Sequence, residues 1–448
     1  MSRTLRLNRV ATAGLAAALL IALGACSGNY PNSTFQPTTE FNREVTGLWN
    51  SMMFWGTAVF VIVEVILIIA IVRYRRRPGG PEAKHVHGNT IMEITWTLAP
   101  ALILVLIAVP TVRTIFRTQA KAVPGALQVE VIGHQWWWEF RYPEYGVTTA
   151  NELYLPIGRT VNFALRTADV LHSFWIPALG GKRDLISNRT NYLWFTPDST
   201  GEAAFNGSCN EYCGASHANM RFRAFTVAPA DFEKWVAGQR ANAAFPAGGA
   251  ATPTAPASAP ASATAQVPSG AAAATATRPT TGAATSVAPA QTAGTPRDSA
   301  APVTAAESWT FPREKVPPHV IPATPIPRGV SISDAVIAGG DAQRGFQTYS
   351  RSACIGCHKI RGNPMSLGII GPDLTHVGSR YTIAGGYYVN DARHLAHWIK
   401  NSRVMKPGSL MQTLGKGEYD PIMRTRVSVG GLTDEQIADV TAYLLSLK

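Results

Sequence analysis

Soft metal ligands gather in one short stretch of this chain. Cys209, Cys213, His217 and Met220 follow one another, and His172 stands upstream of them. Thiolates, imidazoles and a thioether together are typical of copper sites that transfer electrons. Two cysteines four residues apart can bridge two copper ions through both sulfurs, with one imidazole for each metal. The pattern therefore predicts a dinuclear copper centre.

Two simpler explanations compete with copper. A disulfide between Cys209 and Cys213 would suit an oxidising compartment, but it leaves His217 and Met220 unexplained. A zinc site would have little use for the thioether of Met220. We therefore expect copper, with Met220 and the backbone carbonyl of Glu211 as weak axial ligands.

A second constellation lies further along the chain. The run Cys-Ile-Gly-Cys-His at 354–358 is the signature of covalent haem c attachment. Cys354 and Cys357 add to the haem vinyl groups, and His358 presents its imidazole to the iron. The run Gly-Pro-Asp-Leu at 371–374 resembles the cytochrome c loop whose proline carbonyl orients the axial histidine, which implies that role for Pro372.

The sixth haem ligand is expected to be a methionine. The candidates are Met365, Met405, Met411 and Met423. Met411 fits best, because it follows Lys-Pro-Gly-Ser-Leu at 406–410, a non-helical stretch like the one that delivers the methionine in small cytochromes c. Methionine raises the haem potential relative to a second histidine, which suits donation to copper.

Two apolar runs are long enough to cross a bilayer. They predict helices over about 48–72 and 95–115, since a hydrocarbon core of about 30 Å needs about 20 residues. Pro100 and Pro110 in the second run must be accommodated by a neighbouring helix or by a local distortion. The loop between the runs is strongly basic, so it should face the cytoplasm and leave both flanks outside.

The N-terminus reads as a secretory signal. Three arginines precede an apolar stretch, and Leu-Gly-Ala-Cys ends at Cys26, so residues 1–25 form a predicted lipoprotein signal peptide. Cleavage there would free the thiol of Cys26 for a lipid anchor. The alternative is a simple signal with an incidental cysteine. Residues 26–120 then hold a short tether and the helical hairpin.

Three further segments follow the hairpin. Alternating apolar and polar residues with regular turn signals predict a small β-sandwich or barrel over 121–230. The Ala/Pro/Thr-rich tract at 240–330 cannot bury enough apolar surface to fold and is expected to be a disordered linker. Residues 331–448 form a compact domain whose last helix begins with a capping box at Thr433 and Gln436.

The copper motif carries a family resemblance. His172 in its run at 169–174 and the stretch 209–220 resemble the dinuclear site, called CuA, of cytochrome c oxidase subunit II. Gly-His-Gln-Trp-Trp-Trp at 133–138 resembles the aromatic signature of that family, which implies that Trp136 receives electrons near the copper. The resemblance further implies that Glu93 lies at the mouth of a proton channel and that the side chain of Glu211 binds magnesium shared with subunit I.

The resemblance implies a multidomain fold and a place in respiration. The expected fold is a two-helix transmembrane hairpin, an all-β cupredoxin-like CuA domain, the linker and an all-α cytochrome c domain, as in oxidases of the caa3 type. Electrons would pass from cytochrome c or quinol-cytochrome c reductase to haem c, to CuA and to subunit I, beside subunit III. Subunit I would reduce dioxygen with proton translocation, and the chain would sit in a bacterial plasma membrane with both redox domains outside.

Other functions are weighed against this one. The net charge of +12 is spread over several regions without a basic stripe, so no nucleic-acid partner is expected. A nitric oxide reductase subunit, or a stand-alone membrane-tethered electron carrier, remains an alternative. Residues 341–448 carry 13 basic and 8 acidic side chains, so we expect the haem domain to dock on the copper domain through weak, salt-sensitive charge contacts.

Overall fold

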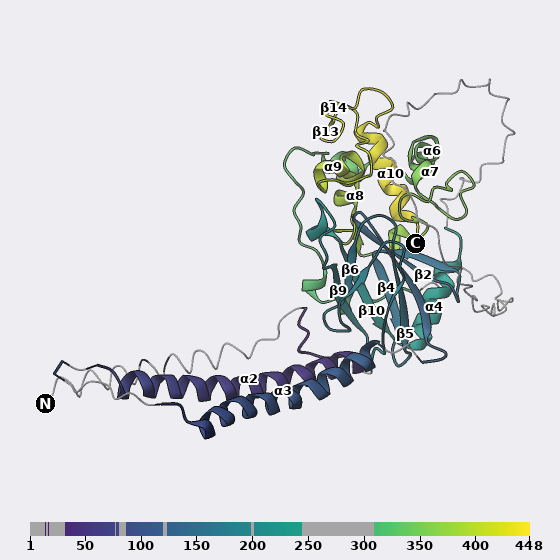
Figure 1. Ribbon diagram of the computed structural model, residues 1–448. Helices are drawn as coiled ribbons and strands as arrows, with labels where there is room; N and C mark the ends of the chain where they lie inside the picture. Colours follow the sequence, from purple (N-terminus) through teal and green to yellow (C-terminus); the bar gives the residue numbers. More distant parts are fainter. Residues whose placement is uncertain are drawn as a thin grey trace, which may run out of the picture.

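The computed structural model describes residues 14, 17, 32–76, 78–79, 87–119, 123–198, 201–243 and 309–448. A pair of long helices, a β domain and a C-terminal domain follow one another, and the C-terminal domain lies on the β domain at the end away from the helices (Figure 1). This architecture confirms the predicted fold class. Cys26, most of the predicted signal peptide and the tract 244–308 lie outside the described residues.

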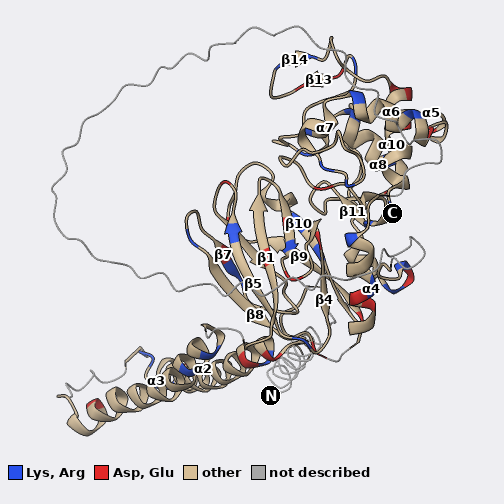
Figure 2. Cartoon of the chain, turned by 90° about the vertical axis from the view of Figure 1, so that its right-hand side faces the viewer, with Lys and Arg blue, Asp and Glu red and all other residues tan. Residues whose placement is uncertain are grey.

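The hairpin consists of α2 (Glu40–Arg73) and α3 (Thr90–Gln119), which lie side by side (Figure 1). The most apolar parts of the two helices have mean hydropathies of 2.7 and 2.1. Both helices are therefore long and apolar enough to cross a membrane. The ribbons of both helices are tan along most of their length, with most of their charged residues toward the ends (Figure 2). Both helices extend beyond the predicted runs, because their polar end turns are helical too.

The first turn of α2 is embedded in the β domain. The Thr39 side chain caps the helix by accepting from the backbone N–H of Asn42, and its hydroxyl donates to the carbonyl of Leu179 at 2.6 Å. The Asn42 amide donates to the carbonyl of Pro177, and Phe41 is buried in the β-domain core. These contacts fix the hairpin to the domain above it.

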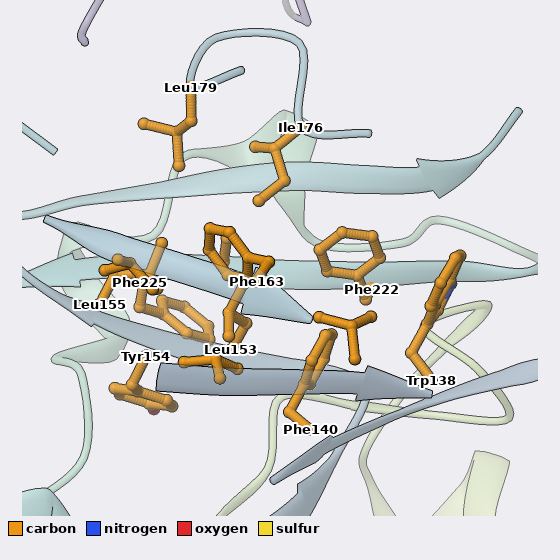
Figure 3. Close-up of a cluster of buried hydrophobic side chains, with 14 of the residues drawn as sticks. Trp138, Phe140, Leu153, Tyr154, Leu155, Phe163, Ile176, Leu179, Phe222 and Phe225 are labelled. Atoms are coloured by element: carbon orange, nitrogen blue, oxygen red, sulfur yellow. The ribbon is translucent and has the colours of Figure 1, made fainter. Parts of the chain in front are cut away.

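The β domain is a sandwich of two five-stranded sheets, with orders β3-β2-β1-β5-β8 and β4-β10-β9-β6-β7. The strands are β1 (Leu127–His134), β2 (Trp137–Tyr142), β3 (Val147–Ala150), β4 (Glu152–Pro156), β5 (Val161–Thr167), β6 (His172–Trp175), β7 (Arg183–Leu185), β8 (Asn191–Phe195), β9 (Ala203–Cys209) and β10 (Arg221–Val227). Alternate residues of β1 are buried, as the sequence pattern predicts. Trp138, Phe140, Phe222 and other aromatic side chains fill the core (Figure 3).

One side of the sandwich is covered by α4 (Pro229–Arg240) and by residues 309–320, while Ile326 beyond them packs on the core of the C-terminal domain. Trp235 of α4 stacks on Tyr154 with ring centroids 4.5 Å apart. Phe311 and Val320 are buried in the same core, and Phe311 contacts Phe225. The predicted linker ran to residue 330, but its last part, from Trp309 onward, follows a fixed path over the β domain and onto the C-terminal domain.

The C-terminal domain is mainly helical. Its elements are α5 (Asp334–Ala338), α6 (Ala342–Arg351), α7 (Cys354–Cys357), β11 (Thr382–Ile383), β12 (Tyr388–Val389), α8 (Ala392–Lys400), α9 (Ser402–Met405), β13 (Tyr419–Asp420), β14 (Thr425–Arg426) and α10 (Asp434–Ser446). The capping box at Thr433 and Gln436 is confirmed. Helices α6 and α10 pack closely at Gly345. A Cβ there would lie 1.9 Å from the carbonyl oxygen of Asp439, so the close approach depends on glycine.

Candidate metal centre and haem site

The predicted copper ligands converge at one end of the sandwich. His172 opens β6, Cys209 ends β9, and the loop from β9 to β10 carries Cys213, His217 and Met220. The Cys209 and Cys213 sulfurs lie 3.8 Å apart, far beyond the about 2.05 Å of a disulfide. Cys209 Sγ lies 3.8 Å from His172 Nδ1, and Cys213 Sγ lies 3.6 Å from His217 Nδ1. The fold thus gathers two free thiols and two imidazoles at one place.

The two weaker ligands complete this cluster. Met220 Sδ is 3.9 Å from Cys213 Sγ, and the side chain is fully buried. The backbone carbonyl of Glu211 is 3.3 Å from Cys209 Sγ. A soft thioether and a carbonyl beside paired sulfurs are a donor set that fits copper better than zinc.

Neighbouring residues orient His172. Its Nε2 is 2.8 Å from a carboxylate oxygen of Asp169, which leaves Nδ1 turned toward the sulfurs. Burial opposes ionisation of Asp169, but hydrogen bonds from His172 and from the backbone of Gln135 outweigh it and lower the pKa. A Cβ at Gly133 would lie 2.8 Å from the His172 ring, so only glycine fits there. Asp169 and Gly133 were not singled out as site residues from the sequence.

The two thiols interact with each other. The contact between their sulfurs lowers the pKa of Cys209 and raises that of Cys213. One thiolate therefore forms readily. A cation that binds both sulfurs would displace the second proton, since thiolates are the ligands that soft metals require.

The predicted haem residues line one cavity, which lies between the C-terminal domain and the β domain. Cys354, Cys357, His358, Pro372 and Met411 all contribute to its wall. Nδ1 of His358 is 2.9 Å from the carbonyl oxygen of Pro372, to which it donates, so Nε2 is free for a metal. Burial lowers the pKa of His358 and keeps the imidazole neutral, the form that binds iron. Two free thiols and a neutral imidazole in one cavity fit a covalently held haem.

Only one of the four candidate methionines lines this cavity in the described residues. It is Met411; Met405 is buried elsewhere, and Met365 and Met423 are 54% and 66% exposed. Ser402 donates its hydroxyl to the carbonyl of Met411 at 2.7 Å, which helps to fix the loop. The placement supports the sequence-based choice of Met411.

Trp136 lies between the two sites. It lines the predicted haem cavity, and its indole N–H donates to the carbonyl of the predicted copper ligand Cys213 at 3.0 Å. The C-terminal domain covers it, so that only 9% of the residue is exposed. Lys406, which the sequence does not mark as special, donates to the carbonyl of Trp136. Burial lowers the pKa of Lys406 to about 7.

The docking expectation is corrected by the structure. Within the described part of the chain, no ion pair joins residues 331–448 to the β domain; buried hydrogen bonds and ring contacts hold them together. Glu152, on β4, accepts hydrogen bonds from two backbone N–H groups of the C-terminal domain. The excess of surface charge on the haem domain is therefore not what positions it.

Two carboxylates with predicted roles, Glu93 and Glu211, occupy very different places in the structure. Glu93 is in the first turn of α3, at the end of the hairpin away from the β domain (Figure 1). The side chain of Glu211 is half-buried next to the copper ligands. Among the residues that the structure describes, neither carboxylate side chain has a partner that would reveal its role.

Comparisons with known families agree with the three-part architecture. The family model described as "Cytochrome C oxidase subunit II, transmembrane domain" matches residues 31–114, and "Cytochrome C oxidase subunit II, periplasmic domain" matches 146–226. The family model "Cytochrome c" matches residues 342–448. These matches imply copper in the β domain, haem in the C-terminal domain, a membrane anchor and an extracytoplasmic β domain.

Relatives cover most of the chain. "Cytochrome c oxidase subunit 2" of Alkalihalophilus pseudofirmus is 29% identical over 396 residues, 87% of this chain and 83% of that protein. "Probable cytochrome c oxidase subunit 2" of Rickettsia bellii is 30% identical over 229 residues, 46% of this chain and 84% of that protein. The crystal structure of the periplasmic domain of subunit II of cytochrome oxidase (CoxB) of Bradyrhizobium japonicum shares 30% identity over 26% of this chain and 96% of that one, with a TM-score of 0.25. The chain belongs to the cytochrome c oxidase subunit II family, with a cytochrome c domain joined to its copper domain.

Proposed function

We propose that this chain is the electron-input subunit of a terminal cytochrome c oxidase. The observation that carries the proposal is the single cavity whose wall combines the haem residues His358 and Met411 with Trp136, which is hydrogen-bonded to the copper ligand Cys213. Haem c and CuA supply reversible one-electron chemistry when bound. We place the reduction of dioxygen in subunit I.

The residues of the chain have separate tasks in this function. Cys354 and Cys357 would hold the haem covalently, while the carbonyl of Pro372 keeps the ring of His358 aimed at the iron. His172, Cys209, Cys213, His217, Met220 and the Glu211 carbonyl would hold the copper pair. Burial of the sulfurs excludes water and disfavours rearrangement of the ligands when an electron arrives or leaves.

The outer parts of the function rest on the family resemblance. Subunits I and III are the proposed partners, with dioxygen reduction and proton translocation in subunit I, and cytochrome c or quinol-cytochrome c reductase is the donor. Glu93 would stand at the mouth of a proton channel, the side chain of Glu211 would bind magnesium, and Cys26 would carry a lipid in a bacterial plasma membrane.

The gas that the complex reduces is the decisive test. The complex should be purified from membranes through this chain and given a reduced donor with oxygen or with nitric oxide. Consumption of oxygen, lost on removal of copper, is the expected result. Reduction of nitric oxide alone would assign the chain to a nitric oxide reductase, and activity with neither gas would favour a stand-alone carrier.

A further inference from the structure

The loop that carries Met411 lies directly against Trp136. Lys406, five residues before Met411, is only 3% exposed, and its Nζ donates to the carbonyl of Trp136 at 2.7 Å and to that of Ala384 at 2.8 Å. A lysine buried between two carbonyl oxygens loses its hydration and keeps hydrogen bonds only in this pose. The residue therefore ties the haem-ligand loop to the backbone of the tryptophan.

The rest of the loop packs on the same tryptophan. Gly408 has φ +84°, and a Cβ there would lie 2.6 Å from Cη2 of Trp136, so glycine is needed for both the backbone conformation and the approach of the ring. The carbonyl of Pro407 accepts a 2.5 Å hydrogen bond from the hydroxyl of Ser216, which lies between the copper ligands Cys213 and His217. Residues 406–408 thus contact the backbone and the ring of Trp136 and the copper loop.

We propose that Lys406 is a positioning residue for electron transfer from the haem to the copper pair, because it holds the Met411 loop against Trp136. This inference rests on the proposed function and assigns one residue to its internal step. The rate of electron transfer falls steeply with the gap between donor and acceptor, so a contact that fixes this gap controls the rate. A corollary is that Trp136 is closed to external carriers, and electrons enter only through the haem.

The chemistry of Lys406 allows a clean substitution. Either protonation state of the amine can donate both hydrogen bonds. Lys406→Met keeps a similar length of apolar chain but leaves the carbonyls of Trp136 and Ala384 without this donor. Lys406 ligates neither metal, so haem attachment and copper binding should survive the change.

The test is a rapid-mixing experiment on the full oxidase complex. A reductant is mixed with oxidised complex, and the haem c absorption and the near-infrared copper band are followed together. Lys406→Met should slow transfer from haem to copper at least tenfold while both static spectra stay unchanged. Lys416→Met, at an exposed lysine of the same domain, should match the wild type.

A second variant keeps the test decisive if Lys406→Met does not fold. Gly408→Ala retains Lys406 but forces the loop away from the ring of Trp136, and should slow the same step. Wild-type transfer rates in Lys406→Met, or in Gly408→Ala when only that variant folds, would overturn the inference. If the wild-type complex itself shows no transfer from haem to copper, the proposed function fails instead.

Discussion

The carboxylate of Glu152 in the β domain accepts a 2.6 Å hydrogen bond from the backbone N–H of Tyr381, which is 229 residues away in the sequence. The neighbouring N–H of Thr382 donates to the same oxygen at 3.1 Å. Glu152 is 3% exposed, with Arg223 and Arg380 close enough to favour its charge. The two redox domains are thus joined by a buried carboxylate.

This carboxylate should make the stability of the docked domains depend on pH. Burial raises the pKa of Glu152 from its ordinary value of 4.5 to about 7, in spite of the opposing hydrogen bonds and arginines. Because the pKa is higher when the domains are docked, the stabilisation is full below about pH 4.5 and is lost as the pH rises to about 7. The loss is at most about 3 kcal/mol.

Glu152→Gln isolates this effect, since its amide oxygen accepts the same bonds but does not titrate. Between pH 5 and pH 8 the thermal midpoint of the wild type should fall relative to that of the variant. Glu144→Gln, at a largely exposed carboxylate, is the control and should follow the wild type. Parallel pH profiles for wild type and Glu152→Gln would contradict the prediction.

Removal of one copper ligand should spare the haem. His217→Ala is expected to abolish the near-infrared copper band, because Cys213 Sγ loses the imidazole 3.6 Å away. The haem c spectrum should stay intact, since the haem residues lie in another domain. His319→Ala, at an exposed histidine, should change neither signal. Simultaneous loss of both signals in His217→Ala would argue against separate sites.

Met411→Ala should leave the haem attached but change its axial ligation. The thiols of Cys354 and Cys357 still hold the ring, while loss of the thioether lowers the haem potential. Absorption spectra and a redox titration report the two properties. Met423→Ala is the matched control at an exposed methionine, and a loss of axial ligation in that variant instead would refute the assignment.

The segment 309–330 should contribute to stability. Phe311 is 1% exposed, its ring packs on Phe225 with centroids 5.1 Å apart, and its carbonyl accepts a hydrogen bond from the hydroxyl of Tyr381. Phe311→Ala should cost about 3–5 kcal/mol in urea unfolding followed by tryptophan fluorescence. Ile321→Ala, at a 41% exposed side chain, should stay within about 0.5 kcal/mol. Equal stability of the two variants would mean that the segment does not stay docked.

Local signals made much of the fold predictable. The apolar runs indicate α2 and α3, alternation indicates β1, and Thr433 with Gln436 marks the start of α10. Copper and haem ligands were recognisable because most of each set is compact in the sequence; His172 and Met411 are the exceptions. Their roles remain predictions until the metals are measured.

The contacts between the domains could not be predicted from local patterns in the sequence. Glu152 and Lys406 look like ordinary surface charges, because their partners are backbone atoms of residues hundreds of positions away. The segment from Trp309 resembled the proline-rich tract before it. Its aromatic residues, Trp309 and Phe311, were the available hint that it packs on a core.

The measurement that tests the central claim most directly is the metal and haem content of the purified full-length protein. We predict two copper ions for each covalently attached haem, and a paramagnetic resonance signal from one electron shared by both coppers. Absence of copper, or a mass spectrum that shows Cys209 and Cys213 joined as a disulfide in the mature complex, would contradict the account.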